Sequence, residues 1–504
     1  MIRDVIVQAG GLGTRMGKYT LNRPKCLISL NGINILQTVN IGFPDANLHI
    51  IGDYKFEVLQ AYLENINHGL KYKLYKAKGK GTIAGIGEVL FNIPKDSPVA
   101  ITWSDLFFTE RVIIPNENEN FVVLSNINKC RYKYENGKFL KQETFRDGII
   151  GVFIFNNRKV LDDIPSEGEF VEFLKEQNIK LSPIIQDSII ELGTADKLEH
   201  YIKNTFNTRF FNKIREEGNF LIKESRDLNR AQMVKDEAEW YKYMVSHSYK
   251  GIPRIISYDP LTMERIDGFH PFTPITLGDE EKGEIVRKIL NELEFIHSIQ
   301  RMPWDDQSTY DVYVMKTAER IKPVTKLLHL ENERKLIING KKVTPLTPNA
   351  RQVLDSIYRR INKNGYFVPI HGDPTFSNIL ITFTGQVKFI DPRGYFGSIK
   401  IFGDKLYDYA KLYYSAVGNY DQFNIQNYIL KKDGNEFTLK IGSSGFESTK
   451  SIFEEMFGNK ITDIELLHSL IWLSLSGYLL NDLDGLIASY IHGLELLDKL
   501  EVEI

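Results

Sequence analysis

The sequence has 504 residues, more than one ordinary hydrophobic core holds, and this length predicts two or more domains. Its composition, 42% hydrophobic and 25% charged, is that of a globular protein. A formal net charge of −2 disfavours a surface that wraps a polyanion, so nucleic acid is not expected as a partner. The two cysteines, Cys26 and Cys130, lack metal-type spacing, and no secretory signal follows Met1. We therefore expect a cytoplasmic protein.

The first two hundred residues alternate short β-rich runs with helical patterns. Buried parallel strands are predicted at Asp4–Gln8, Leu48–Ile51 and Val99–Thr102, with helices at Gln37–Gly42 and Phe56–Asn65. This alternation predicts an α/β domain with a Rossmann-like, doubly wound sheet that binds ligands at the carboxyl ends of its strands. Phe121–Ser125 and Arg131–Lys141, which contains an Asn136-Gly137 turn, are expected to add antiparallel strands and make the sheet mixed.

A glycine-rich turn, QAGGLGTR from Gln8 to Arg15, follows the first predicted strand. Glycines allow a backbone to approach phosphates closely and to adopt positive φ, and the departure from GxGxxG disfavours a dinucleotide site. Arg15, and Lys25 ten residues later, supply cations suited to oxyanions. The candidate nucleotide-binding residues of this turn are Ala9, Gly10, Gly11, Gly13 and Thr14.

The pattern AGGLGTRM…RPKCLISLNG resembles the nucleotidylyltransferases that activate sugar phosphates and related small phosphates. GTIAG, which contains Gly81 and Thr82, is similar to the family's GTAG segment near the base and sugar. Asp105 stands where the family has a metal-binding aspartate, and Glu191, in ELGT, where the family usually has Asp. The resemblance covers residues 1–200. It implies that Asp105 and Glu191 bind Mg²⁺, which screens the repulsion between two phosphates, and that Arg15 and Lys25 are catalytic.

We place the domain boundary in the predicted helix Ala195–Asn204, which has no Pro/Gly-rich linker, and so expect domains at 1–203 and 204–504. Beyond it, Phe210–Ile214 and Asn219–Glu224 are predicted to pair as strands and Asp236–His247 to form a helix. After short strands at Ile255–Ser257 and Met263–Ile266, the pattern is mainly helical except near Ile379–Phe383 and Val387–Ile390. A small β-rich lobe before a helical lobe predicts a bilobal α+β, kinase-like domain.

One late apolar stretch, Leu466–Leu480, is interrupted by polar residues such as His468 and by Gly477. It is too short and too polar to span a bilayer, so we expect a buried helix and no membrane insertion.

A second motif, HGDPTFSN followed by FIDPRG, begins at His371. It resembles the HGDxxxxN…IDxxx pattern of the aminoglycoside phosphotransferase and choline kinase family. That likeness implies that Asp373 is the catalytic base and that Asn378 and Asp391 hold Mg²⁺ on ATP. We expect His371 to brace the loop, and Asp404 and Asp408, in GDKLYDYAKL, to be structural.

In the preceding lobe, FLIKE resembles the strand whose lysine holds the ATP phosphates, which implicates Lys223. Glu237 is the preferred helix partner of Lys223, with Glu239 second. The segment MERIDG resembles the hinge that receives adenine through backbone groups, which adds Glu264 and Ile266 to the nucleotide-binding candidates.

Together the motifs predict a bifunctional enzyme. The second domain would phosphorylate a small hydroxyl compound with ATP, and the first would transfer NMP from CTP, UTP, GTP or dTTP to the product and release pyrophosphate. A sugar 1-phosphate is slightly favoured as the acceptor. The alternative is a CTP-dependent enzyme for choline, ethanolamine or another amino-alcohol or polyol.

The expected output is an activated precursor for surface polysaccharide, such as a capsule, or for lipid head groups. A non-catalytic role for one domain, or NMP transfer to a protein or nucleic acid, is less favoured. The acceptor, the nucleoside and the oligomeric state stay open.

Overall fold

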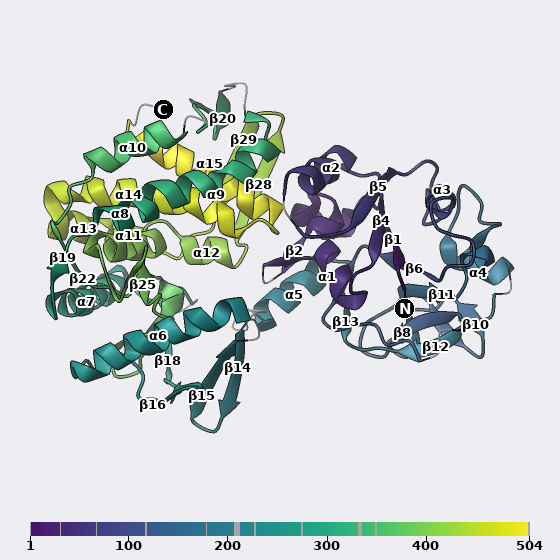
Figure 1. The fold of residues 1–504 in the computed structure, drawn as a ribbon, viewed down its shortest axis with the longest axis horizontal. Coiled ribbons are helices and arrows are strands. Elements are labelled where there is room, and N and C mark those ends of the chain that lie inside the picture. Colours follow the sequence, from purple (N-terminus) through teal and green to yellow (C-terminus); the bar gives the residue numbers. More distant parts are fainter. Residues whose placement is uncertain are drawn as a thin grey trace. The chain divides into compact units, whose positions relative to one another are not determined.

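The computed structural model describes residues 2–501 except 31, 67, 116–117, 178, 206–211, 226–227, 274–275, 331–334 and 348–349. Two compact units are present (Figure 1). The first contains Met1–Asn204 and Leu480–Asp484, and the second contains Thr205–Leu479 and Gly485–Ile504. Helix α5 (Ala195–Thr205) ends the main part of the first unit, one residue later than predicted, and part of the predicted strand Phe210–Ile214 lies outside the described residues.

The first unit is built on a mixed α/β sheet, as the sequence predicts. Strands β6, β1, β4 and β5 run parallel, in that order, and β11 joins antiparallel to β6. The strands of this path are β1 (Asp4–Ala9), β4 (Asn47–Gly52), β5 (Tyr72–Lys76), β6 (Val99–Trp103), β9 (Lys133–Glu135), β10 (Lys138–Leu140) and β11 (Gly148–Phe155). Strands β8 (Phe121–Ser125) and β12 (Ser182–Ile185) extend the sheet beyond β11.

Both faces of this sheet are covered. Val5, Ile6 and Val7 are all fully buried although successive side chains point to opposite faces. The face that carries Ile6 packs against α3 (Ile86–Leu90) and α4 (Phe170–Glu176). Helices α1 (Ile35–Gly42) and α2 (Phe56–Asn65) complete the unit, and α2 has the predicted bounds.

Of two outer parts of the sheet, one was predicted from the sequence and the other was not. The predicted Asn136-Gly137 turn is present, with φ of 51° and 75°, and joins β9 to β10 in a hairpin. Strand β11 was not predicted, although all eight of its residues are buried. Two smaller sheets lie in the same unit and consist of β2 (Ser29–Leu30) with β3 (Ile33–Asn34) and β7 (Leu106–Phe108) with β13 (Ile189–Glu191).

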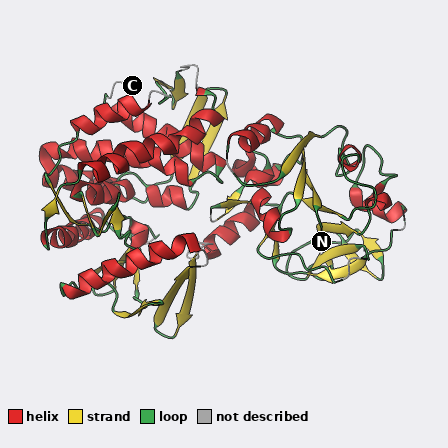
Figure 2. Cartoon of the chain, in the orientation of Figure 1, coloured by secondary structure: helices red, strands yellow, loops and turns green. Residues whose placement is uncertain are grey.

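The second unit begins with a four-stranded antiparallel sheet in the order β14–β15–β17–β16. Its strands are β14 (Asn212–Glu217), β15 (Phe220–Ser225), β16 (Ile255–Tyr258) and β17 (Leu261–Glu264). Helix α6 (Leu228–Ser246) contacts β15 and begins eight residues before the predicted start at Asp236. This sheet and helix precede a part dominated by helices (Figure 2).

The helical part contains α7 (Asp279–Ser298), α8 (Asp306–Tyr310), α9 (Lys316–Leu327), α10 (Ala350–Arg360), α11 (Lys405–Ala416), α12 (Tyr420–Asn424), α13 (Lys450–Phe457), α14 (Ile461–Leu475) and α15 (Leu483–Lys499). Its short strands are β18 (Gly268–Phe269), β19 (Met302–Pro303), β22 (Tyr366–Pro369), β23 (Ile379–Thr382), β24 (Val387–Phe389), β25 (Tyr395–Phe396), β26 (Ile399–Lys400) and β27 (Phe402–Gly403). The predicted buried helix near Leu466 is α14, which ends at Leu475.

A further sheet interrupts the region that the sequence predicted to be mainly helical. Strands β20 (Leu336–Ile338), β21 (Lys341–Val343), β28 (Tyr428–Asp433) and β29 (Glu436–Ile441) form it in the order β21–β20–β29–β28. The alternating run from Tyr428 to Ile441, broken at Asp433-Gly434, is a hairpin pattern that the helical prediction overlooked.

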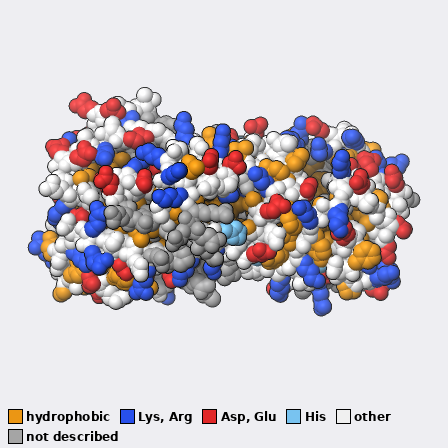
Figure 3. All heavy atoms as spheres, turned by 90° about the horizontal axis from the view of Figure 1, so that it is seen from above, with side chains coloured by type: hydrophobic (Ala, Val, Ile, Leu, Met, Phe, Trp, Pro, Cys, Tyr) orange, Lys and Arg blue, Asp and Glu red, His pale blue; other side chains and the backbone are white. Residues whose placement is uncertain are grey.

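The distribution of charged side chains and the character of the helices match what the composition predicts. Basic and acidic side chains are interspersed over the face seen in Figure 3, as expected for a net charge of −2. Within the described ranges, no helix combines the length and apolar character that crossing a membrane requires.

Candidate functional site

In the first unit the glycine-rich turn follows β1 at the carboxyl edge of the sheet. Gly13 has a φ of 63°, and a Cβ at this position would lie 2.8 Å from the Thr20 side chain, so glycine is required. The Thr20 hydroxyl donates to the Gly13 carbonyl (3.1 Å) and holds the turn in place. Gly13 uses the freedom of glycine to adopt positive φ, whereas Gly10 and Gly11 do not have positive φ. A Cβ at Gly11 would meet no atom within 4 Å, which leaves open space beside the backbone.

Cations flank this turn. Thr14 and Arg15 are exposed at the start of the short helix Thr14–Thr20. Lys25 begins another short helix after Pro24, and its Nζ lies 2.9 Å from Asp105 Oδ2. Arg23 of the same segment is buried, so Lys25 is the cation of this segment that reaches the carboxylate.

Asp105 and Glu191 converge, although 85 residues separate them in the sequence. Asp105 lies between β6 and β7, Glu191 ends β13, and the β7–β13 pairing places Glu191 opposite Leu106. A Cβ on Gly193 would overlap the Glu191 carboxylate and would lie 3.1 Å from Asp105 Oδ2. The two carboxylates therefore border the same point.

The pair suits a divalent cation that also binds substrate phosphates. Asp105 Oδ1 is buried and has no hydrogen-bond partner among the described residues, so one oxygen is left for a ligand. No group of three or more His, Cys, Asp or Glu in the described ranges could hold a metal by itself. Mg²⁺ commonly takes one or two carboxylates together with phosphate oxygens, and Asp105 with Glu191 fits that donor set.

Lys197, on α5, is a site residue that the sequence analysis missed. Its ammonium pairs with Glu191, and the Gly193 amide donates to the other oxygen of that carboxylate (2.9 Å). Burial, with Arg15 and Lys129 nearby, lowers the pKa of Lys197, whereas Asp105 acts in the opposite direction. Lys25 and Lys197 thus neutralise the two carboxylates. No motif in the sequence marks Lys197.

Two unpartnered donors lie at the same sheet edge. Gln8 and Trp103 are in register on the adjacent parallel strands β1 and β6, so their side chains point to the same face. Gln8 Nε2 and Trp103 Nε1 are buried and, within the described part of the chain, have no hydrogen-bond partner. A buried donor without an acceptor is costly, which makes both N–H groups candidates for contacts with a ligand.

Gly81 and Thr82 lie in a loop packed against residues 168–170. Gly81 has a φ of 88°, and a Cβ there would overlap the Gly168 carbonyl. The Thr82 hydroxyl donates to Glu169 (2.9 Å) and accepts from the Phe170 amide (2.8 Å). The Thr82 side chain is therefore engaged in holding the loop to α4, and nucleotide contacts by Gly81 and Thr82 stay predictions.

In the second unit, Lys223 on β15 has the helix partner that the sequence predicts. Lys223 Nζ lies 2.6 Å from Glu237 Oε2 on α6 and 2.8 Å from Asp391 Oδ1. Burial acts against the charge, but Asp391 and Glu237 raise the pKa of Lys223 above its ordinary value. The ion pair between Lys223 and Asp391 connects the sheet that contains β15 to the loop after β24.

The HGD loop follows β22 and is braced from within. His371 is fully buried, Nε2 donates to the Ile390 carbonyl (3.0 Å) and Nδ1 accepts from the Asp373 amide (3.3 Å). Burial lowers the pKa of His371, so the ring is neutral near pH 7. Asp408 accepts from the amides of His371 (2.8 Å) and Gly372 (2.7 Å). Both His371 and Asp408 therefore have the structural roles predicted for them.

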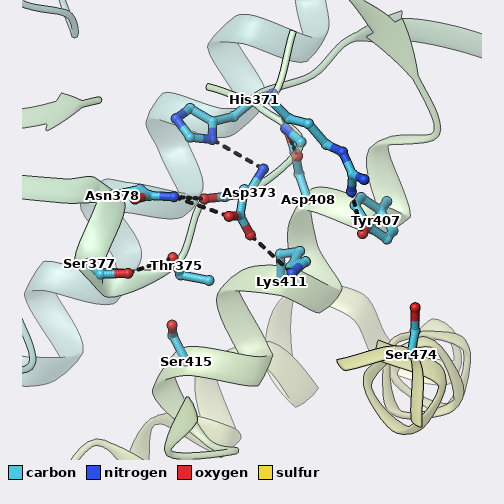
Figure 4. Close-up of polar contacts among 12 residues, drawn as sticks. His371, Asp373, Thr375, Ser377, Asn378, Tyr407, Asp408, Lys411, Ser415 and Ser474 are labelled. Carbon is cyan, nitrogen blue, oxygen red and sulfur yellow. Dashed lines mark hydrogen bonds and ion pairs between the residues drawn. The ribbon is translucent and has the colours of Figure 1, made fainter. Parts of the chain in front are cut away.

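Asp373 is contacted through both of its carboxylate oxygens (Figure 4). Asn378 Nδ2 donates to Oδ2 (3.3 Å) and to the Asp373 carbonyl (2.9 Å). Lys411, on α11, lies 3.0 Å from Oδ1. Lys411 was not among the residues predicted from the sequence, although it stands three residues after Asp408 on the same face of α11.

Asp391 and the segment after β17 complete the candidate residues of this unit. Asp391 has a φ of 54°, which is uncommon for a residue other than glycine, and it directly follows Ile390, whose amide donates to the Asn378 carbonyl (3.0 Å). The Glu264 amide donates to the Arg254 carbonyl (2.9 Å). Ile266 is half-buried, and a hinge role for Glu264 and Ile266 stays a prediction.

Comparison with known proteins gives likenesses among solved structures. No protein-family model matches the sequence, and no curated protein matches it significantly. The chain is similar to the CTP:phosphocholine cytidylyltransferase of Streptococcus pneumoniae, with 15% identity and a TM-score of 0.33 over 40% of this chain and 98% of that one. It is also similar to the inositol-1-phosphate CTP transferase of T. maritima, with 14% identity and a TM-score of 0.33 over 42% and 96% of the two chains.

HddC from Yersinia pseudotuberculosis is a third such structure, with 15% identity and a TM-score of 0.34 over 40% of this chain and 97% of that one. At these identities and scores, what those proteins act on stays a property of those proteins.

Proposed function

We propose that the chain is a bifunctional transferase. The second unit phosphorylates a small hydroxyl compound with ATP, and the first transfers NMP from a second nucleoside triphosphate to the resulting phosphate. The observation that carries the proposal is that each unit places predicted metal ligands beside a cation. Asp105 and Glu191 border one point, with Lys25 paired to Asp105. In the second unit Asp391 pairs with Lys223, and it follows Ile390, whose amide donates to the Asn378 carbonyl. Anion-to-anion chemistry requires such charge neutralisation.

In the first unit, the open backbone at Gly11 and the exposed Arg15 are suited to hold a triphosphate. Asp105 and Glu191 would hold Mg²⁺, which when bound supplies positive charge between the two reacting phosphates. Lys25 pairs with Asp105 and Lys197 with Glu191, and both ammonium groups would be close enough to contact phosphate oxygens held at this site. Pyrophosphate leaves beside the same cations.

The acceptor of the first unit is proposed to be rich in oxygen. Gln8 and Trp103 each offer a buried N–H group that a hydroxyl or carbonyl oxygen would satisfy. A trimethylammonium group offers no acceptor for them. These donors therefore favour a sugar phosphate over phosphocholine. CTP, UTP, GTP and dTTP all remain candidates as the nucleotide.

In the second unit, Asp373 receives the proton of the acceptor hydroxyl, and Lys411 and Asn378 fix its carboxylate. Asn378 and Asp391 would hold Mg²⁺ on the ATP phosphates, and Lys223, fixed by Glu237, is suited to the phosphates themselves. The small antiparallel sheet followed by helices fits the bilobal, kinase-like organisation expected from the sequence.

The product would be a nucleotide-activated precursor for surface polysaccharide or lipid head groups. A CTP-dependent enzyme for an amino-alcohol or polyol is the second candidate, and ethanolamine or choline would be its substrate. A third reading makes one unit a non-catalytic binding module. The convergence of Asp105 with Glu191, and the contacts made by Asp373, disfavour that reading in either unit.

The test replaces Asp105 and Asp373 separately by Asn in the full chain. A screen for pyrophosphate release with four NTPs and a panel of sugar and alcohol phosphates reports the first unit, and ATP consumption with the unphosphorylated compounds reports the second. Each variant should lose one activity by at least about 100-fold and keep the other.

Exposed aspartates provide matched controls. Asp96→Asn, in the first unit, and Asp433→Asn, in the second, should leave both activities unchanged. Retention of both activities in Asp105→Asn and Asp373→Asn would refute the assignment. If Asp96→Asn or Asp433→Asn lost an activity, replacement of an aspartate in that unit would be shown to act by lowering its stability.

A further inference from the structure

Four cationic side chains gather near Asp373 and form what we call the cationic cluster: Lys316, Arg320, Arg393 and Lys411. Lys316 and Arg320 are four residues apart and so share one face of α9. Arg393 stands two residues after Asp391. The Arg393 amide donates to the carbonyl of His371 in the HGD loop (2.8 Å). Lys411 reaches Asp373 itself (3.0 Å).

The charges of the other three cations reach Lys316, and the Arg320 guanidinium lies 3.7 Å from the centre of the Tyr478 ring. Burial, followed by Arg393, Arg320 and Lys411, lowers the pKa of Lys316 well below its ordinary value. The same three neighbours act on Tyr478, where burial opposes ionisation but their charges lower the pKa of the phenol. Lys316 and Tyr478 thus lie inside one field of positive charge.

The cluster has few negative partners. Lys411 pairs with Asp373, whose charge also acts on Lys316. The ion pairs found among the described residues include none made by Lys316, Arg320 or Arg393. Arg320 donates to the Ser474 hydroxyl (3.0 Å) and Arg393 to the Tyr407 hydroxyl (3.2 Å), both of which are neutral. Like charges held together in a partly buried place repel one another, and an anion between them would remove that cost.

The residues suited to ATP make a different set of contacts from the cluster. Lys223, Glu237 and Asp391 form the group assigned to the nucleotide phosphates. Asn378 contacts Oδ2 of Asp373, whereas Lys411 contacts Oδ1 (Figure 4). The attacking hydroxyl must contact the catalytic base and face the phosphoryl donor at the same time. Asn378 is assigned to the metal on the donor, so we take the Lys411 side of Asp373 as the acceptor side.

The aromatic residues beside the cluster are not arranged to receive a cationic acceptor. The Arg320 guanidinium already stacks on the Tyr478 ring, 3.7 Å from the ring centroid. The Lys411 ammonium lies over the Tyr414 ring in the same way, 5.1 Å from the ring centroid. An ammonium group would compete with the protein's own cations for these faces and would be repelled by them.

We propose that the acceptor phosphorylated by the second unit bears an anionic group, a carboxylate or a phosphate, which the cationic cluster binds. The inference rests on the proposed phosphotransfer. The acceptor oxygen bonds to the γ-phosphorus of ATP, the bond from that phosphorus to the β,γ-bridging oxygen breaks, ADP leaves, and the hydroxyl proton passes to Asp373. An aminoglycoside or choline is excluded as the preferred acceptor.

Binding of an anion tests the cluster without requiring phosphotransfer. D-glycerate and glycerol phosphate are titrated calorimetrically into the full chain with saturating Mg²⁺ and ADP. Replacing Lys316 or Arg320 by Gln should weaken binding of at least one anion by roughly 10- to 100-fold, because each removes a charge-assisted hydrogen bond. Lys322→Gln is the matched control, since Lys322 is exposed on the same helix and pairs with Glu319.

Equal affinity in the wild type, Lys316→Gln and Arg320→Gln would overturn the proposal. The variants are accepted as folded when their thermal unfolding and their pyrophosphate release by the first unit match those of Lys322→Gln. The carboxylate and phosphate probes distinguish the two sources of negative charge.

ATP consumption separates this inference from the proposed function. Alcohols are compared in matched neutral, carboxylate, phosphate and ammonium forms. We expect kcat/KM to be at least roughly 10-fold higher for an anionic form, and a preference for the ammonium or neutral form would refute the inference. Anion binding that depends on Lys316, with no ATP consumption for any alcohol, would support the cluster and contradict the phosphotransfer.

Discussion

Replacing Gly193 by Ala should disable the first unit without unfolding it. The backbone φ of Gly193 is not in the left-handed region, so alanine is conformationally allowed. Its Cβ would overlap the Glu191 carboxylate, which must move by about 1 Å to reach an ordinary contact distance. Glu191 would then no longer share a metal position with Asp105. A displacement of this size costs on the order of 100-fold in rate when it affects groups that position the reactants.

The assay is pyrophosphate release with the NTP and acceptor phosphate selected by the screen. Gly193→Ala should lose activity on the order of 100-fold while ATP consumption by the second unit is unchanged. Gly87→Ala is the control, because a Cβ there would meet only Ile164 at 3.8 Å, an ordinary contact. Full nucleotidyl transfer by Gly193→Ala would refute the role given to Glu191.

Three further predictions concern burial and charge. Burial raises the pKa of the Cys26 thiol to about 12 and that of Cys130 to about 11, so neither should react with a thiol reagent at pH 8 until the chain is unfolded. Burial raises the pKa of Asp421 from 3.8 to about 6, so its contribution to stability is complete below pH 3.8 and is lost as pH rises through 6. Urea unfolding should therefore show about 1 kcal/mol more stability at pH 5 than at pH 7, relative to Asp421→Asn; an equal pH dependence in both proteins would contradict this. Replacing Asp408 by Ala leaves two buried amides without their acceptor and should cost about 3 kcal/mol together with ATP consumption, while pyrophosphate release persists; wild-type stability in this variant would refute the bracing role.

The parallel part of the first sheet could be predicted because its signals are local. The apolar runs at β1 and β4 are bounded by glycine or polar residues, and the glycine-rich turn follows β1 directly. The His371 and Asp408 roles were also predictable, since both belong to motifs whose likeness covers the loop and the helix that supports it.

Other parts depend on partners distant in the sequence. Strand β11 contains Gly148 and Gly151, which weaken a strand prediction, and it is stabilised by antiparallel pairing with β6 and β8. Glu191 meets Asp105 only because β13 pairs with β7. No local pattern reveals such a pairing.

The cationic cluster shows the same limit at the second site. Lys316 and Arg320 come from α9, a helix without a recognised motif, and they meet Lys411 through the packing of helices. A lysine on an amphipathic helix is usually a solvated residue. Only the three-dimensional arrangement distinguishes these cations from ordinary surface charges.

The central claim is that one chain carries out two consecutive transfers at separate sites. It is tested most directly by mixing equal amounts of full-length Asp105→Asn and Asp373→Asn with the unphosphorylated acceptor, ATP and the second NTP. Neither variant alone should form the nucleotide-activated product, and the mixture should form it, because the phosphorylated intermediate made by one chain is used by the other. Product formation by either variant alone, or none by the mixture when each retains its single activity, would contradict the account.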